Sequence, residues 1–112
     1  MTDNAQTTKI RSLNDSFRRN LVIGSTVLLS QSVTCLEPER LAELLEAVRT
    51  FNNFTRANDP HGEHDFGSID LNSERYFFKI DYYDLSPAMG SPNPANPAVT
   101  GRVMTIMLAD EY

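Results

Sequence analysis

The stretch RYFFKIDYY, residues 75–83, decides the fold class of this chain of 112 residues. Large side chains recur at every second position and share one face of an extended chain: Tyr76, Phe78, Ile80 and Tyr82. A period of two with this aromatic content is typical of a β-strand that has one buried face. We therefore predict a strand over residues 75–83, with its Tyr76 face packed against helices.

The segments around this strand complete a sheet. Residues 66–71 are predicted to pair with it as a hairpin joined at Asn72-Ser73, because asparagine tolerates the positive φ of a two-residue turn. Residues 99–108 are apolar on both faces, which predicts a central strand, with a short C-terminal helix as the alternative.

A fourth strand is predicted nearer the N-terminus. Residues 26–30 are rich in valine and leucine and follow the turn signal Gly24-Ser25. Residues 31–35 either extend this strand or turn back as a short strand of their own.

Residues 8–20 have the period of an amphipathic helix, with Thr7 or Thr8 as its cap. Its apolar stripe consists of Ile10, Leu13, Phe17 and Leu21. Three arginines lie off that stripe, and we expect them in solvent: Arg11, Arg18 and Arg19.

A second helix begins at Glu37-Pro38-Glu39, where proline and acidic residues suit the first turn. Its apolar stripe consists of Leu41, Leu44, Leu45, Val48 and Phe51, and we expect it to end near residues 52–53.

These segments predict a single α+β domain over residues 1–112, with two helices packed on a mostly antiparallel sheet of about four strands. Residues 1–7 are predicted to be a flexible N-terminus. Residues 85–98 contain four prolines and are predicted to be a surface loop.

Charge is distributed unevenly over the chain, whose net charge is −5. Residues 1–36 carry four basic and two acidic side chains, a balance of +2, whereas residues 59–112 carry three basic and nine acidic ones, a balance of −6. Because phosphate repels the acidic part, we expect no direct binding to nucleic acid. The natural complement is a protein partner with a basic surface.

The chain has a single cysteine, so it forms no internal disulfide, which fits a reducing compartment. We interpret Cys35 as a small core residue. The more specific alternative is that it acts as a catalytic nucleophile. No signal peptide is evident, and no apolar run approaches the ~20 residues of a membrane span. We therefore expect a cytoplasmic protein that does not enter membranes.

The stretch DPHGEHD, residues 59–65, holds five groups able to bind a metal or carry a proton: Asp59, His61, Glu63, His64 and Asp65. Imidazole with carboxylate suits zinc, manganese or iron, or a general acid–base pair. The plainer interpretation is a tight turn before a strand, with Gly62 at positive φ and His64 or Asp65 bonded to the loop. A partner-binding role is the third possibility.

The end of the aromatic strand pairs carboxylates with tyrosines, which resembles an interface patch. The predicted partner-binding residues are Asp59, Glu63, His64, Asp65, Asp81, Tyr83 and Asp84. No catalytic residue, metal site or cofactor is assigned, because the chain has no phosphate-binding glycine loop, no CxxC pair and no readable triad.

The leading hypothesis is a non-enzymatic binding protein, either an accessory protein or an inhibitor, that docks on a basic surface of a nucleic-acid-handling or defence complex. The alternative is a metal-assisted hydrolase. In that enzyme the metal ligands or the catalytic base come from Glu63, His64 and Asp65. The coordination shell of the metal is completed by Asp81 or Asp84.

The chain also resembles a bacterial family catalogued as domain of unknown function 3768. The resemblance covers residues 10–112 and rests on LNDSFRRN, LLEAVRTFNNFT, NDPHGEHDFG, FFKIDYYD and NPAVTGRVMTIMLADEY. In the family pattern the position of His61 is commonly tyrosine, which leaves Glu63, His64 and Asp65 as the candidate ligands. The resemblance implies no activity. It does imply kinship with short accessory proteins of bacterial chromosomes and mobile elements, some of which counter host defence.

Overall fold

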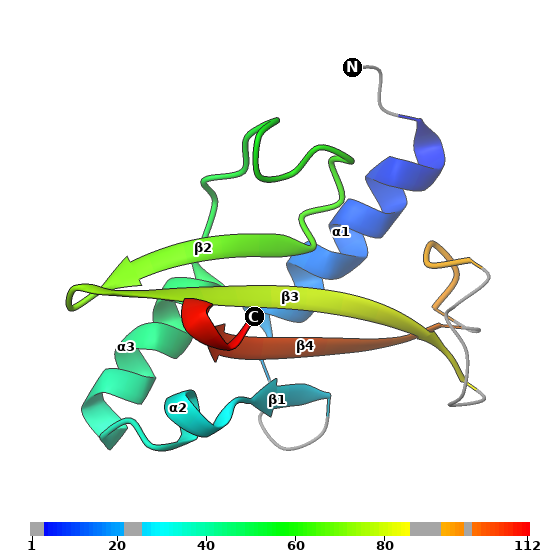
Figure 1. Ribbon diagram of the computed structural model, residues 1–112. Helices are drawn as coiled ribbons and strands as arrows, with labels where there is room; N and C mark the ends of the chain where they lie inside the picture. The colour runs from blue at the N-terminus through cyan, green and yellow to red at the C-terminus, as the bar shows by residue number, and fades with distance from the viewer. Residues whose placement is uncertain (1–3, 22–25, 86–92, 98–99) are drawn as a thin grey trace.

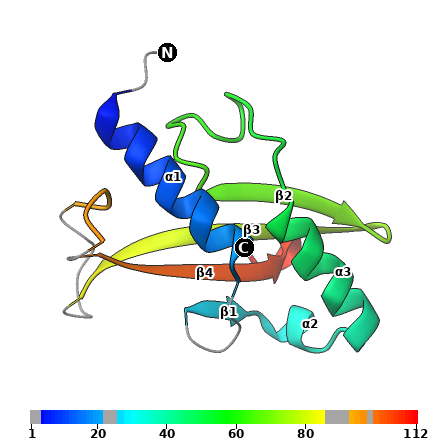
Figure 2. The ribbon, with the colours of Figure 1, turned by 180° about the vertical axis from the view of Figure 1, so that it is seen from behind.

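A four-stranded sheet with helices on one face forms the frame of the protein (Figures 1 and 2). The computed structural model describes residues 4–21, 26–85, 93–97 and 100–112. The elements in chain order are α1 (Ala5–Arg19), β1 (Val27–Leu29), α2 (Gln31–Thr34), α3 (Pro38–Arg49), β2 (Phe66–Leu71), β3 (Glu74–Asp84), β4 (Thr100–Leu108) and the 3₁₀ helix η1 (Ala109–Glu111).

The strand order is β1-β4-β3-β2. β2 pairs antiparallel with β3, β3 pairs antiparallel with β4, and only β1 runs parallel to its neighbour β4. The mostly antiparallel α+β sheet is therefore confirmed, and residues 99–108 contain a central strand rather than a helix. Asn72 (φ 53°) and Ser73 (φ 68°) both take positive φ, as expected for the two-residue hairpin.

The core lies between the sheet and the helices that cover one of its faces (Figure 2). We call the sheet face toward α1 and α3 the inner face. The most deeply buried members of the core come from β1, β3, β4, α2 and α3, and include Val27, Val33, Leu44, Val48, Phe78, Ile80, Met104 and Ile106. Gly67 on β2 leaves room for the Phe78 ring, since a Cβ there would lie 2.2 Å from Phe78 Cε2. The predicted inward face of the aromatic strand is thus confirmed.

α1 begins earlier than predicted. The side chain of Asn4 accepts a hydrogen bond from the Thr7 amide at 2.7 Å, which caps the helix at Ala5. Residues 5–7 are therefore the first helical turn rather than part of a flexible terminus. Residues 1–3 lie outside the described residues.

The prediction of a strand at residues 31–35 is wrong, because this segment is the short helix α2. The Ser30 side chain caps it by accepting a hydrogen bond from the Val33 amide. Glu111 reinforces the cap, since its carboxylate accepts hydrogen bonds from the Ser30 hydroxyl at 2.6 Å and from the Ser32 amide at 3.2 Å. Cys35 follows the helix and is exposed, so its interpretation as a core residue is also wrong.

α3 begins as predicted, with Pro38 in its first turn and Glu37 as the N-cap residue, but it ends at Arg49 rather than at residues 52–53. Of the predicted surface loop, residues 86–92 and 98 lie outside the described residues. Residues 93–97 form turns, and the Thr100 hydroxyl donates to the Asn93 carbonyl at 2.7 Å. Within the described residues, no helix is long and apolar enough to cross a bilayer.

Candidate functional site

The predicted partner-binding residues fall into two groups on different sides of the molecule. Asp59, Glu63 and His64 lie in the loop that faces α1, where hydrogen bonds and an ion pair join them to that helix or to each other. Asp81 and Tyr83 alternate with the inward residues of β3 and so lie on the opposite face of the sheet. These residues therefore do not form one surface.

The remaining acids of the predicted set lie at the ends of strands. Asp65 immediately precedes β2, and its carbonyl accepts a hydrogen bond from the Ile80 amide at 2.8 Å. Burial raises the pKa of Asp65, and the nearby Glu63 carboxylate raises it further. Asp84 is the last residue of β3 and lies opposite Thr100 of β4.

His64 joins the loop to α1. Its Nδ1 lies 2.8 Å from Oδ1 of Asp15, and its Nε2 lies 3.6 Å from Oδ2 of Asp59. The imidazole stacks on the Phe54 ring with the centroids 3.8 Å apart and the planes 4° apart. The backbone of His64 has φ 57°, a left-handed conformation that this set of contacts stabilises.

Asp59 organises the turn itself. It is only 6% exposed, and its Oδ1 accepts hydrogen bonds from the amides of Glu63 and His64, both at 3.1 Å. Gly62 takes φ 70°, which agrees with the predicted positive φ. The loop is therefore a bonded turn in which His64 also reaches across to the helix. His61, by contrast, is exposed.

Arg18 corrects another expectation, because it is only 1% exposed rather than solvated. Its Nη1 lies 2.8 Å from Oδ1 of Asp15, and its guanidinium carbon lies 5.2 Å from the centroid of the Phe54 ring. The buried guanidinium has an ion-pair partner in Asp15 and packs against the face of the Phe54 ring, and these two contacts explain its burial. Its Nε has no hydrogen-bond partner among the described residues.

The charge of Asp15 is balanced from two sides. Partial burial raises the pKa of its carboxyl group, but the hydrogen bonds and charges of Arg18 and His64 outweigh that effect and hold the pKa below its usual value. Asp15 is thus an ionised carboxylate already occupied by partners of the same cluster.

A second polar cluster connects the loop to the far end of the sheet. The Tyr82 hydroxyl donates to Glu63 Oε1 at 2.7 Å and accepts from Asn14 Nδ2 at 2.8 Å. Arg102 Nε donates to Asn14 Oδ1 at 2.8 Å, and its guanidinium also donates to the Pro94 carbonyl. Burial raises the pKa of Tyr82, and the hydrogen bond to Glu63 raises it further, so the hydroxyl stays protonated and donates.

Sequence reasoning missed Asn14 and Arg102. Asn14 is fully buried on α1, one turn after the buried Ile10 and one turn before the buried Arg18. The spacing of four residues between Ile10, Asn14 and Arg18 was the available signal. It was overlooked because only apolar side chains were counted in the buried stripe of this helix.

The metal-binding arrangement does not assemble as proposed. The register pairs Phe66 with Lys79, so β3 continues five residues past the start of β2. Asp81 lies on the other face of the sheet, where it forms an ion pair with Lys79 at 3.0 Å, and does not join Glu63 and His64. Across residues 4–21, 26–85, 93–97 and 100–112, no group of three His, Cys, Asp or Glu side chains could hold a metal ion.

The second face of the sheet carries no helix of the α1–α3 layer, and η1 lies over one part of it (Figure 1). We call this the open face. Its side chains come from alternate positions of all four strands and from the C-terminus, and include Leu28, Phe66, Asp70, Phe77, Lys79, Asp81, Tyr83 and Tyr112. Leu28 is 55% exposed and Tyr83 is 40% exposed.

Two adjoining parts of the open face, which share Phe77, are chemically distinct. Phe66, Phe77 and Tyr112 form an aromatic cluster with ring centroids 5.0 to 6.0 Å apart. Near the hairpin turn, Asp70, Glu74 and Asp110 line a hollow of about 520 Å³ together with Phe77 and Arg75.

Comparison with known proteins gives a family but no characterised relative. No curated protein and no solved structure matches the chain. The model of one family, described as a protein of unknown function (DUF3768), matches residues 29–111, which include β4, the long strand β3 and the whole loop from 50 to 65. The chain belongs to the DUF3768 family.

Proposed function

We propose that this protein is a non-enzymatic binding protein whose open face docks on a basic surface of a protein partner. The observation that carries the proposal is the composition of the open face, which combines exposed apolar side chains with a surplus of acidic ones. The helices cover the other side of the sheet, so this face is free of the α1–α3 layer (Figures 1 and 2).

The apolar part of the open face suits the centre of an interface. Leu28 on the edge strand β1 and Tyr83 near the end of β3 are both exposed, and Tyr112 is 75% exposed beside Phe66 and Phe77. Aromatic side chains supply large contact areas at a low entropic cost and are enriched at binding hot spots.

The charged part of the open face selects the partner. Asp70 is paired with Arg75 and Asp81 with Lys79, while Glu74 and Asp110 make no ion pair among the described residues. The surplus is therefore negative, and a complementary partner presents lysines and arginines. Proteins that handle nucleic acid present such surfaces to phosphate, so we propose an accessory or inhibitory role on a complex of that kind, in the cytoplasm.

Affinity capture with matched charge variants tests this proposal. Asp81→Lys combined with Tyr83→Ala alters the open face near the C-terminal end of β3, whereas Glu43→Lys makes the same charge change on the exposed side of α3. A partner captured by the wild type and by Glu43→Lys, but at least about tenfold less by the double variant, supports the open face. Capture should also weaken as salt is raised.

Equal loss of the partner in Glu43→Lys would contradict the proposal, because it would show a response to net charge alone. Retention of every partner by the double variant would contradict it as well. Circular dichroism of each variant establishes that the fold is intact before the comparison is made.

A further inference from the structure

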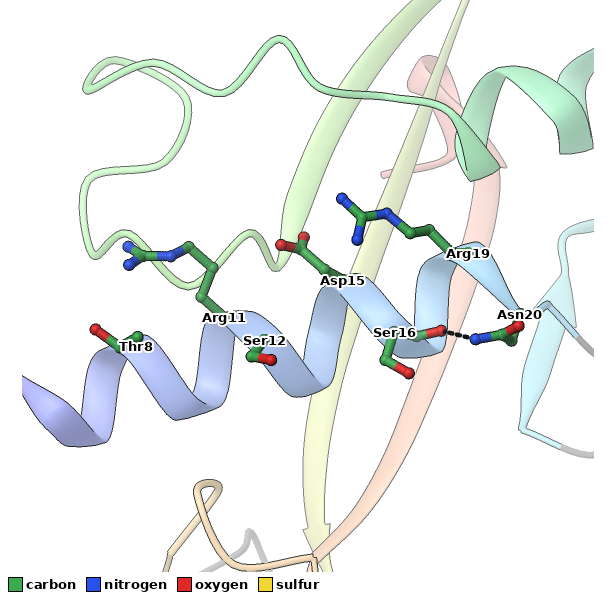
Figure 3. Close-up of a pocket in the computed structure, with 7 residues that line it drawn as sticks. All are labelled: Thr8, Arg11, Ser12, Asp15, Ser16, Arg19 and Asn20. Carbon is green, nitrogen blue, oxygen red and sulfur yellow. Dashed lines mark hydrogen bonds between the residues drawn. The ribbon is translucent and has the colours of Figure 1, made fainter.

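A small hollow lies where the second half of α1 meets the chain that leaves α3 and the loop that precedes β2. It has a volume of about 160 Å³, and its lining combines two arginines, an acid, an amide, a histidine and two aromatic rings: Asp15, Arg18, Arg19, Phe51, Asn52, Phe54 and His64. We call this the Arg18 hollow. Figure 3 shows two of its side chains, Asp15 and Arg19, which project from the same side of α1 toward the chain between α3 and β2.

Arg18 is the buried member of this lining, and one edge of its guanidinium has no acceptor. The side chain is only 2% exposed. Nη1 donates to Oδ1 of Asp15 at 2.8 Å, whereas neither Nε nor Nη2 forms a hydrogen bond within the described residues, and Nε is fully buried. Buried polar groups in folded proteins are almost always hydrogen-bonded, because an unpaired donor loses its hydration without compensation. An acceptor from outside the chain would satisfy this edge.

The geometry of the unpaired edge selects a carboxylate. In a guanidinium, Nε–H and one N–H of Nη2 point in the same direction, and these parallel donors match the two oxygens of a carboxylate. Arg75 uses the same edge in this protein, since its Nε and Nη2 donate to the two carboxylate oxygens of Asp70 at 2.9 and 3.4 Å. A neutral carbonyl offers one oxygen and matches the pair of donors less well.

The charge of the lining favours an acceptor that carries a single negative charge. Its two arginines outnumber its one acid, and Oδ1 of that acid, Asp15, is already shared by Arg18 and His64 at 2.8 Å each. Arg19 is exposed and forms no ion pair within the described part of the chain. One carboxylate balances the surplus charge of the arginines, whereas the second charge of a phosphate dianion would be repelled by Asp15.

The size and the aromatic wall of the hollow limit what else the ligand contains. Phe51 and Phe54 meet edge to face with their ring centroids 4.8 Å apart, and a hydrocarbon group packs well on such rings. The volume of 160 Å³ is below the roughly 300–1,000 Å³ of sites for drug-sized ligands. The hollow therefore suits a small acid or a single acidic side chain.

We propose that the Arg18 hollow binds a carboxylate group, which accepts from the Nε and Nη2 edge of Arg18 and is balanced by Arg19, with its hydrocarbon part on the aromatic wall. The source is a small free acid or an acidic side chain of another protein, because both present the same group. The hollow lies on the helix side of the sheet, so the proposal does not rest on the docking of the open face.

An NMR titration with sodium benzoate tests the proposal, because the Nε–H of an arginine gives its own ¹H–¹⁵N signal. In the ¹⁵N-labelled full chain we expect the Arg18 Nε signal to move saturably, together with the backbone amides of residues 15–19, 51–54 and 64. Benzamide has the same ring and no charge. It should bind at least about tenfold more weakly, because an ionised acceptor forms the stronger hydrogen bonds.

Variants with matched charge changes separate the hollow from the rest of the surface. Arg19→Gln should weaken benzoate binding about tenfold, since it removes the balancing cation. Its control is Arg40→Gln, which removes the same charge from α3 and should leave the affinity within about twofold of wild type. Arg18→Lys keeps the charge but lacks the parallel donors, so it should also bind at least about tenfold more weakly. If that variant does not fold, the Arg18 Nε signal of the wild type still decides.

A repeat of the titration with a peptide that contains one glutamate separates the two sources. Tighter binding of the peptide supports an acidic side chain of another protein, and tighter binding of benzoate supports a free acid. An Arg18 Nε signal that does not move would overturn the proposal, because water alone would then satisfy this edge. Shifts that never saturate, equal binding of benzamide, or equal weakening by Arg40→Gln would overturn it as well. The Asp81→Lys, Tyr83→Ala variant should bind benzoate normally, so failure of one proposal leaves the other intact.

Discussion

Replacing His64 tests the contact that holds the 59–65 loop on α1. His64→Ala removes the 2.8 Å contact with Asp15 and the 3.8 Å stack on Phe54. A hydrogen bond to a charged group contributes about 1.5–3 kcal/mol, and an aromatic pair about 0.5–1.5 kcal/mol. Histidine adopts the left-handed backbone of this position more readily than alanine does, so the backbone does not reduce this loss. We expect the free energy of unfolding to fall by about 2–4 kcal/mol, a large share of the usual total of about 5–15 kcal/mol.

A double-mutant cycle isolates the contact between the two side chains. Urea unfolding of wild type, His64→Ala, Asp15→Asn and the double variant should give a coupling of about 1–2 kcal/mol, since both side chains are less than a quarter exposed. Asp70→Asn, on the exposed β2 edge, is the matched control and should add to His64→Ala within about 0.5 kcal/mol. A His64–Asp15 coupling below about 0.5 kcal/mol would refute the reasoning, because Asp15 would then not hold the loop.

Three further changes probe other parts of the structure. Gly67→Ala should destabilise the protein by about 1–3 kcal/mol in urea unfolding, since its Cβ meets the buried Phe78 ring at 2.2 Å, and an unchanged midpoint would contradict this packing. Tyr82→Phe should cost about 1–3 kcal/mol, because it leaves Glu63 Oε1 without its donor, and a neutral result would mean that water replaces the hydroxyl. The Ser30 hydroxyl and two backbone amides lower the pKa of Glu111 from 4.5 to about 2, so its stabilisation is complete above pH 4.5 and is lost as the pH falls toward 2. Thermal melts of wild type and Glu111→Gln should therefore converge over that interval, and curves that stay parallel would contradict the assignment.

The sequence predicted the elements whose pattern is local. The alternation of residues 75–83 and the stripe after Pro38 each follow from neighbouring positions in the chain, and both elements are present. The helical turn at 31–34 was missed although its cap residue, Ser30, is adjacent to it; the second partner of that cap, Glu111, lies 81 residues away from Ser30 in the chain. Four residues are too few for periodicity to separate a helix from a strand.

The same distinction applies to the candidate site. The sequence singled out residues 59–65 as the densest polar segment, and Gly62 does take the positive φ that the turn needs. The sequence could not predict that Arg18 is buried, since its burial depends on the ring of Phe54, 36 positions later in the chain. The pattern of a helix predicts that arginine faces solvent. Arg18 is buried only because the rest of the fold brings the Phe54 ring against it.

The parallel pairing of β1 with β4 constrains the order in which the chain reaches its native state. The β2–β3 hairpin closes through a two-residue turn and can form early, whereas β4 joins it only after residues 100–108 are available, and Val27 must find Met104 across most of the sequence. Until then the long edge of β3 is unpaired and the inner face of β1 is uncovered. Such intermediates pair with one another between chains, so a nascent or thermally opened molecule should aggregate through β3, and slow synthesis of the C-terminal third should lengthen that interval.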